Sequence, residues 1–174
     1  VQPTEEEFSA FVFKIQANMN PAHRDRLAFI RIVSGHFGRG MTVNYSRSGK
    51  PVKLSQPQQF LAQDRTIIEE AWPGDIVGLF DPGVFGIGDT LSVSRSSDFA
   101  FADFPIFPPE RFCRVQPKDT MKRKQFLKGI TQLTQEGAVQ LFQQDDTLAE
   151  SYVVGAVGQL QFEVLEYRLK NEYG

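Results

Sequence analysis

The chain has 174 residues, which allows one large domain or two small ones. Hydrophobic residues make up 41%, aromatic residues 12% and charged residues 23%, a globular composition that excludes a disordered or fibrous chain. The formal net charge of −2 excludes an overall positive field for nucleic acid but still allows a local basic patch.

Simple features of the sequence also bear on its compartment. The single cysteine excludes an intramolecular disulfide framework and is typical of a reducing compartment, so we expect a cytoplasmic protein. No apolar run approaches the ~20 residues that a membrane-spanning helix needs, and no signal-peptide pattern opens the chain, so we expect no membrane partner. Because the chain starts with Val1 rather than Met, we expect a fragment or a processed product. Separately, we expect a monomer.

Residues 1–93 are expected to form an all-β domain. Phe11, Phe13, Ile15 and Ala17 alternate with other residues, which predicts a half-buried strand with these four side chains on one face. Many short strands separated by turns indicate a barrel or a sandwich, and a closed barrel is favoured because closure removes exposed sheet edges. The further strands are expected at residues 27–33, 41–45, 52–54, 66–68, 76–80 and 90–93.

Two further expectations concern this barrel. We expect no helix longer than two turns between Leu27 and Phe80. Trp72 precedes a Pro-Gly turn, and we expect it to be largely buried because its large apolar surface gains from shielding.

Residues 94–109 are predicted to be a linker, and residues 110–174 a second domain. Three prolines and four phenylalanines in the linker predict a restricted segment that packs down on its surroundings. The second domain follows the order strand, helix, strand, strand, helix, which is a ferredoxin-like α+β domain that lacks its last strand. We therefore expect one unprotected sheet edge.

Both helices of this domain are expected to pack on the sheet. The spacing of apolar residues predicts that the first helix packs through Phe126, Ile130 and Leu133. The second helix, residues 158–172, is expected to pack through Leu160, Val164 and Leu169.

No catalytic, cofactor or metal site is predicted. No G-x-x-x-x-G-K-[ST] loop occurs, and the glycines of residues 35–40 and 83–88 are interpreted as turn residues. One Cys and two His lack the paired spacing of a zinc site. Cys113 is interpreted as a core thiol rather than a reactive one, and His23 as a residue of a polar loop.

Local charge is more informative than the total. Basic residues crowd residues 24–53 and 111–128, where Asp25 and Asp119 are the only acids. One interpretation is a surface for an anionic partner, with one basic stretch in each expected domain. The other is a solvated helix face and solvated hairpin ends, and charge alone does not choose between the two.

Several strings resemble known translation factors. Residues 13–21, running into His23-Arg24-Asp25-Arg26, resemble the opening of domain II in the release factor 3 family of bacterial translational GTPases. Residues 31–41, 73–76 and 87–91 are similar to barrel motifs that translational GTPases share, and residues 155–163 resemble a domain III segment of release factor 3 and elongation factor G. The resemblance covers nearly the whole chain, and only the first string is specific to release factor 3.

The resemblance implies a barrel like domain II of elongation factor Tu and a domain III-like domain that together dock on the ribosome. In this family an N-terminal G domain binds GTP or GDP with Mg, and the GTP-driven cycle removes class-I release factors from the ribosome during termination. The resemblance therefore implies two partners for this chain, the ribosome and the protein's own G domain. No P-loop occurs in this chain, so we expect neither catalysis nor a cofactor in it.

The candidate ribosome contacts come from the two basic stretches, since Lys and Arg provide most contacts to RNA phosphates. They are Arg24, Arg26, Arg39, Arg47, Lys118, Lys122, Arg123 and Lys124. The four in the second stretch are expected on the outward face of a helix. Alternative readings are the same domains of elongation factor G or another translational GTPase, a β-barrel enzyme, and a stand-alone RNA-binding barrel.

Overall fold

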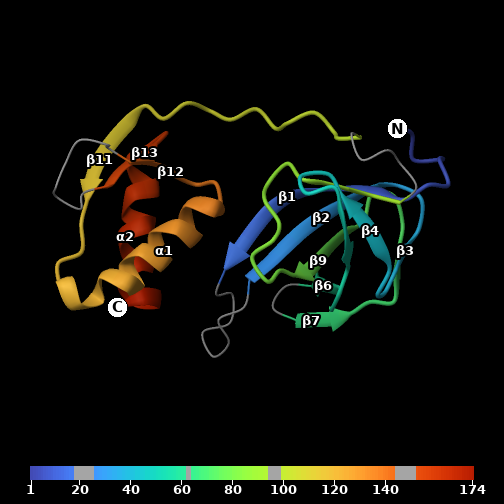
Figure 1. Ribbon diagram of the computed structural model, residues 1–174, viewed down its shortest axis with the longest axis horizontal. Helices are drawn as coiled ribbons and strands as arrows, with labels where there is room; N and C mark the ends of the chain where they lie inside the picture. The colour runs from blue at the N-terminus through green and yellow to red at the C-terminus, as the bar shows by residue number, and fades with distance from the viewer. Residues whose placement is uncertain (18–25, 62–63, 94–98, 144–151) are drawn as a thin grey trace. The chain divides into compact units, whose positions relative to one another are not determined.

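The computed structural model describes residues 1–17, 26–61, 64–93, 99–143 and 152–174, and the labels below are those of Figure 1. The chain divides into two compact units, unit 1 (Val1–Phe104) and unit 2 (Pro105–Gly174). Each unit has a hydrophobic core of its own, so each is described by itself.

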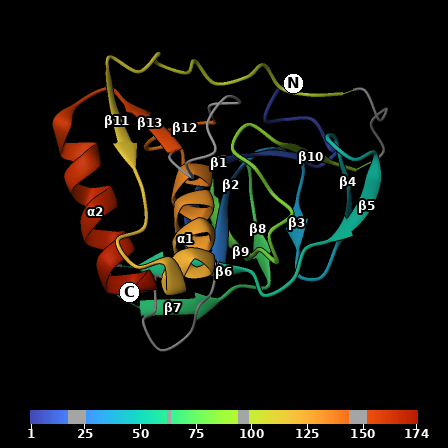
Figure 2. The same cartoon turned by 60° about the vertical axis from the view of Figure 1, so that its left-hand side comes forward.

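Unit 1 is a curled antiparallel sheet (Figures 1 and 2). Its main sheet has the strand order β5-β4-β10-β1-β2-β9-β6-β7, and β3 pairs with β8 in a separate two-stranded ribbon. No helix occurs between Leu27 and Phe80 in the described residues, as predicted. The curled sheet confirms a domain of the barrel type, but β5 and β7 at its ends are not paired with each other in the described residues, so the sheet is a half-barrel and not the closed barrel that the sequence favours. The strands are β1 (Ser9–Ala17), β2 (Arg26–Ser34), β3 (Phe37–Gly38), β4 (Thr42–Tyr45), β5 (Lys50–Lys53), β6 (Gln58–Leu61), β7 (Asp64–Ile67), β8 (Glu70–Ala71), β9 (Ile76–Phe80) and β10 (Thr90–Ser92).

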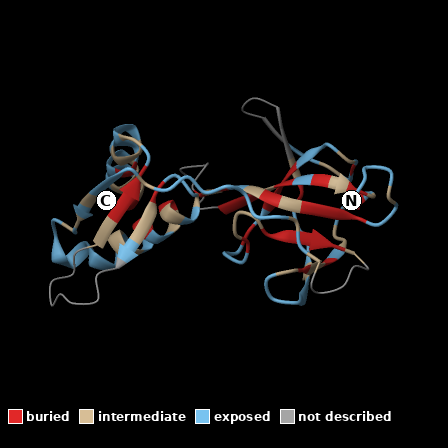
Figure 3. Cartoon of the chain, turned by 90° about the horizontal axis from the view of Figure 1, so that it is seen from above, coloured by how far each residue is buried: buried red, intermediate tan, exposed pale blue. Residues whose placement is uncertain are grey.

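The core of unit 1 is built from the inner faces of these strands, which Figure 3 shows as buried. On β1 the prediction of a single bulky face is wrong. A register shift between Val12 and Lys14 changes which side chains point inward, as a β-bulge does, so that Val12 and Ile15 are both buried. Phe11 lies outside the core and packs its ring at 5.3 Å from that of Phe104. The part of the predicted linker that holds Phe101 and Phe104 therefore packs within unit 1.

Two positions show how the turns of unit 1 are constrained. Gly35 has a φ of +69°, and a Cβ there would lie 2.5 Å from the backbone nitrogen of Phe8, so only glycine fits. The prediction for Trp72 is wrong, because its side chain is 58% exposed. Phe37 and Ala71 face each other in the β3–β8 ribbon and both point into the core. Successive side chains of a strand point to opposite sides, so Trp72, the residue after Ala71, points away from the core.

Unit 2 is a small two-layer α+β domain. Its sheet has the order β11-β13-β12, and both helices cover one face of it (Figure 1). This confirms the predicted ferredoxin-like domain without a last strand, because β11 is paired only with β13 in the described residues. The elements are β11 (Arg111–Val115), the 3-10 turn η1 (Thr120–Lys122), α1 (Arg123–Gln135), β12 (Gln140–Gln143), β13 (Tyr152–Ala156) and α2 (Gln159–Tyr173).

Helix α1 packs as predicted, with Ile130 and Leu133 buried and Phe126 packed against the same core. Helix α2 also packs on the sheet, and Leu169 packs as predicted, but Leu160 and Val164 do not. Leu160 and Val164 are 68% and 46% exposed, whereas Leu165 and Tyr173 are buried and Phe162 and Leu169 pack beside them. Apolar residues occupy two faces of α2, so spacing alone could not identify the packed one. In the described residues, no helix is both long and apolar enough to span a membrane.

Candidate functional site

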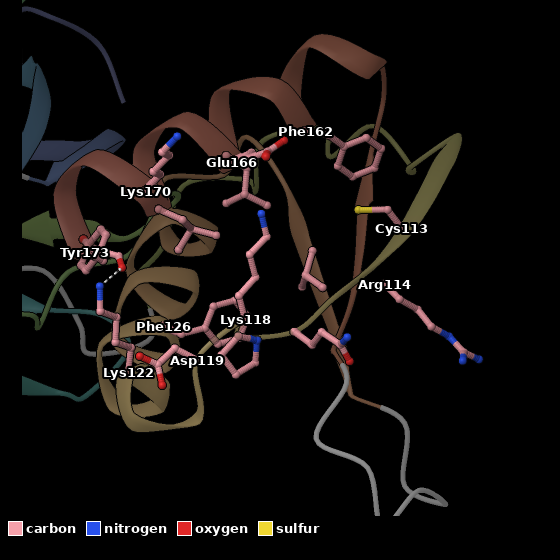
Figure 4. A pocket seen from close by; sticks show the side chains of 16 residues that line it. Cys113, Arg114, Lys118, Asp119, Lys122, Phe126, Phe162, Glu166, Lys170 and Tyr173 are labelled. Atoms are coloured by element: carbon pink, nitrogen blue, oxygen red, sulfur yellow. Dashed lines mark hydrogen bonds between the residues drawn. The ribbon is translucent and has the colours of Figure 1, made fainter.

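A pocket of about 680 Å³ opens in unit 2 between β11, η1 and α2 (Figure 4). It lies along the edge of β11 that has no strand partner in the described residues. Its lining combines apolar side chains with basic ones and with the carboxylates of Asp119 and Glu166. The apolar part comes from Phe126, Phe162, Leu165, Leu169 and Tyr173, and the basic part from Arg114, Lys118, Lys122 and Lys170.

The basic residues predicted around α1 divide between two places. Lys118 and Lys122 line the pocket, and Lys122 Nζ donates a hydrogen bond to the carbonyl oxygen of Gly174 at 2.9 Å. Arg123 and Lys124 do not line it and are exposed at the start of α1. Lys124 and Lys128 are four residues apart on the solvent face of this helix. One basic stretch in the sequence therefore forms two separate basic groups.

Arg26 must be removed from the set of candidate RNA contacts. Arg26 is only 8% exposed, and its Nε donates a hydrogen bond to Asp81 Oδ2 at 2.7 Å inside unit 1. A second guanidinium nitrogen donates to the carbonyl oxygen of Phe85 at 2.7 Å. The side chain is buried because it joins the start of β2 to the loop after β9, so it is a structural cation that does not face a phosphate.

Arg47 is held by a carboxylate but keeps an exposed surface. Its Nε donates to Asp89 Oδ1 at 2.8 Å, while the Tyr45 hydroxyl donates to Asp89 Oδ2 at 2.6 Å. The hydrogen bond to Asp89 raises the pKa of Arg47. Burial, followed by the bond to Asp89, raises the pKa of Tyr45 well above its ordinary value. The Arg47 side chain is still 64% exposed. It can therefore contact another molecule while it stays bound to Asp89.

Arg39 is also exposed and paired. Its guanidinium donates to Glu69 Oε1 at 2.7 Å, with 51% of its side chain exposed. Arg24 lies outside the described residues. Sequence reasoning did not identify Asp81, Asp89 and Glu69 as partners, since they are 30 to 55 residues distant from the arginines along the chain.

The described residues contain no cluster of three or more His, Cys, Asp or Glu that could hold a metal ion. Cys113 is half-buried against the core of unit 2, and burial raises the pKa of its thiol, so it is a poor nucleophile. What the geometry offers is charged and aromatic surface on two rigid units.

Comparison with known proteins identifies these units. Residues 7–94 match the family of elongation factor G domain 2, and residues 101–174 match the class II release factor RF3, C-terminal domain. The full 174 residues are 60% identical to peptide chain release factor 3 of Symbiobacterium thermophilum. The chain belongs to the release factor 3 family. The chain is also 54% identical over 173 residues to peptide chain release factor 3 of Streptococcus mutans.

The chain spans about a third of the length of these relatives. It covers 33% of the Symbiobacterium protein, and a third relative, from Acaryochloris marina, is 51% identical with 32% of its length covered. A crystal structure of a Thermus thermophilus protein matches 97% of this chain and 24% of its own, with a TM-score of 0.78 and 22% identity. That likeness shows that the two proteins share the fold.

Proposed function

We propose that this chain is a non-catalytic, ribosome-docking part of a release factor 3 that promotes the departure of class-I release factors during translation termination. The observation that carries the proposal is the identity of 60% to a named release factor 3 over the whole chain. Binding and hydrolysis of GTP belong to a G domain, whose P-loop this sequence does not contain. The two units then transmit the state of that domain as rigid bodies, the usual way in which nucleotide switches act on large partners.

The surface proposed to meet ribosomal RNA consists of the exposed cations Arg39, Arg47, Lys118, Lys122, Arg123 and Lys124, together with Arg24. Each contact with a phosphate releases counterions, so that losing one contact lowers the salt dependence of binding by roughly one unit of slope. The division around α1 makes a sharper test, because the pocket side and the solvent side of this region can be neutralised separately.

The experiment uses the full-length factor and measures its affinity for ribosomes against salt concentration. One double variant carries Lys118→Gln and Lys122→Gln, a second carries Arg123→Gln and Lys124→Gln, and a control carries Lys14→Gln and Arg65→Gln, which lie outside both basic stretches. We expect at least one of the first two to bind more weakly, with a slope lower by about two units, and the control to bind normally. Equal losses of ribosome affinity in all three variants would show that only the net charge of the factor matters. No loss of affinity in any variant would show that these cations only keep the surface solvated.

A second measurement tests the assignment of nucleotide chemistry. Calorimetric titration of the 174-residue chain with GTP and magnesium is expected to show no binding. Binding in the micromolar range would overturn the proposal that this part of the factor acts without nucleotide.

A further inference from the structure

Trp72 is a large aromatic side chain that neither the core nor the basic surfaces account for. Its backbone is held firmly at the turn after β8. The Trp72 N–H donates to Asp75 Oδ2 at 2.8 Å, and the Asp75 N–H donates to the Trp72 carbonyl oxygen at 3.0 Å. The Gly74 N–H donates to the carbonyl oxygen of Ile32 at 2.8 Å, which ties the turn to β2. Because the backbone of this turn is already held, binding at the exposed indole does not have to order the loop.

The neighbours of Trp72 form a small surface on the outer side of the β3–β8 ribbon. Its ring lies 4.5 Å from the ring of His36, measured between centroids. Glu70 Oε1 lies 3.7 Å from His36 Nε2, and Glu70 is paired with Gly38 in the ribbon. A Cβ on Gly38 would meet nothing within 4 Å, so the space beside Glu70 is open. We call His36, Gly38, Glu70 and Trp72 the ribbon face.

The ribbon face itself carries negative charge. The side chain of Glu70 is 65% exposed, and Asp75 is exposed beside Trp72. Arg39, the cation that follows β3, donates to Glu69 and is not one of the ribbon-face residues. The Glu70 carboxylate itself does not bind a phosphate, whereas an aromatic face next to a carboxylate attracts a guanidinium or ammonium group.

We propose that the ribbon face docks an arginine side chain of a protein partner. The planar guanidinium lies against the indole of Trp72, where a cation–π interaction stabilises it. One edge of the guanidinium donates to the carboxylate of Glu70 above the open space at Gly38. This site is separate from the proposed contacts with RNA phosphates, because it recognises a cation and belongs to a protein–protein contact.

The chain provides its own reporter for this site, because Trp72 is its only tryptophan. The 174-residue chain is titrated with the peptide acetyl-Gly-Arg-Gly-Arg-Gly-amide, with the same peptide carrying Glu in place of Arg, and with oligo(U). We expect the arginine peptide alone to change the Trp72 fluorescence in a saturable way. Saturation by oligo(U) and not by the arginine peptide would overturn the proposal in favour of base stacking.

Variants with matched charge separate a site from general attraction. Glu70→Gln is expected to weaken binding of the arginine peptide by about two- to fivefold, the range for one exposed ion pair. Glu163→Gln removes the same charge from α2 of unit 2 and is expected to leave the affinity unchanged. Equal losses in both variants would show attraction by net charge and overturn the site.

A second readout does not need the indole. In Trp72→Phe, amide chemical shifts report on binding, and we expect the shifts of residues 36–38 and 70 to respond to the peptide more weakly than in the native chain. Shifts centred elsewhere, or an unchanged response in this variant, would overturn the assignment to the ribbon face. None of these outcomes depends on whether the factor binds ribosomes.

Discussion

The two units of the chain are held together in different ways. In unit 1, two buried carboxylates accept hydrogen bonds from side chains that are distant in the sequence. Asp81 accepts from Arg26, and Asp89 accepts from Tyr45 and Arg47. Unit 2 has a smaller core, and its comparable polar group joins its two helices, because Arg168 of α2 donates to Glu136, which follows α1, and to Glu172. Unit 2 also leaves large apolar side chains such as Phe112, Leu160 and Tyr167 exposed. The comparison teaches that buried carboxylates tie strands to loops in unit 1, whereas in unit 2 the polar group ties one helix to the other above the helix–sheet core.

Two spectroscopic signals allow the units to be followed separately. Trp72 lies in unit 1, so its fluorescence reports unfolding of the barrel. The described α-helices, α1 and α2, both lie in unit 2, so helical circular dichroism reports that unit. Each prediction below states which signal changes.

The largest effect is expected from Asp81→Ala in unit 1. The Asp81 side chain is fully buried and accepts from Arg26 and from the backbone N–H groups of Gly83, Val84 and Phe85. Its removal leaves a buried guanidinium without its carboxylate, which costs about 3–5 kcal/mol. Urea unfolding followed by Trp72 fluorescence should show this loss, with the helical signal unaffected. A loss in the helical signal instead would contradict the independence of the two units.

A pair of neighbouring residues tests which face of α2 is packed. Leu165→Ala is expected to lower the free energy of unfolding of unit 2 by about 2–5 kcal/mol, because Leu165 is 5% exposed in the core. Val164→Ala is expected to change it by less than about 0.5 kcal/mol, because Val164 faces solvent. Urea unfolding followed by helical circular dichroism measures both. Similar losses in the two variants would mean that α2 packs on both sides.

Gly129→Ala is expected to destabilise unit 2 by about 1–3 kcal/mol, although alanine favours a helix by about 1 kcal/mol over glycine. An added Cβ would lie 2.7 Å from Tyr173 Cγ and 2.8 Å from Leu169 Cδ2, where the two helices touch. Gly38→Ala in unit 1 is the control, because its Cβ enters open space. Thermal unfolding followed by both signals distinguishes them. A more stable Gly129→Ala protein would show that the helices can move apart at little cost.

The smallest effect is a pH dependence of unit 1. The pKa of Tyr45 is raised in the folded state, mainly by burial. Its contribution to stability is therefore complete below the unfolded value of about 10 and declines as the pH rises above it, by at most about 1.4 kcal/mol per pH unit. Trp72 fluorescence during urea unfolding between neutral and alkaline pH should show this decline. In Tyr45→Phe the slope above pH ~10 should be smaller, and an equal slope would assign the decline to other groups.

Several features of the site were predictable because they depend on residues close together in the sequence. The sequence alone shows that no P-loop is present and that cations are concentrated at residues 111–128. The position of each cation in the structure could not be predicted from the sequence. Whether Lys122 faces the pocket or solvent depends on where η1 ends and on how α1 meets α2, and Arg26 became buried because Asp81, 55 residues away, lies opposite it.

The sequence by itself determined the two kinds of fold, because period-two alternation, turn residues and helical spacing are local properties of the chain. Tertiary structure decided which faces those elements present. A bulge in β1 reversed the positions of Phe11 and Val12, and helix α2, apolar on two sides, buried Leu165 rather than Val164. The same holds for Trp72, which is exposed because Phe37 and Ala71 already occupy the core side of their ribbon. Such choices depend on which surfaces meet across the core, and contacts between residues distant in the chain decide them.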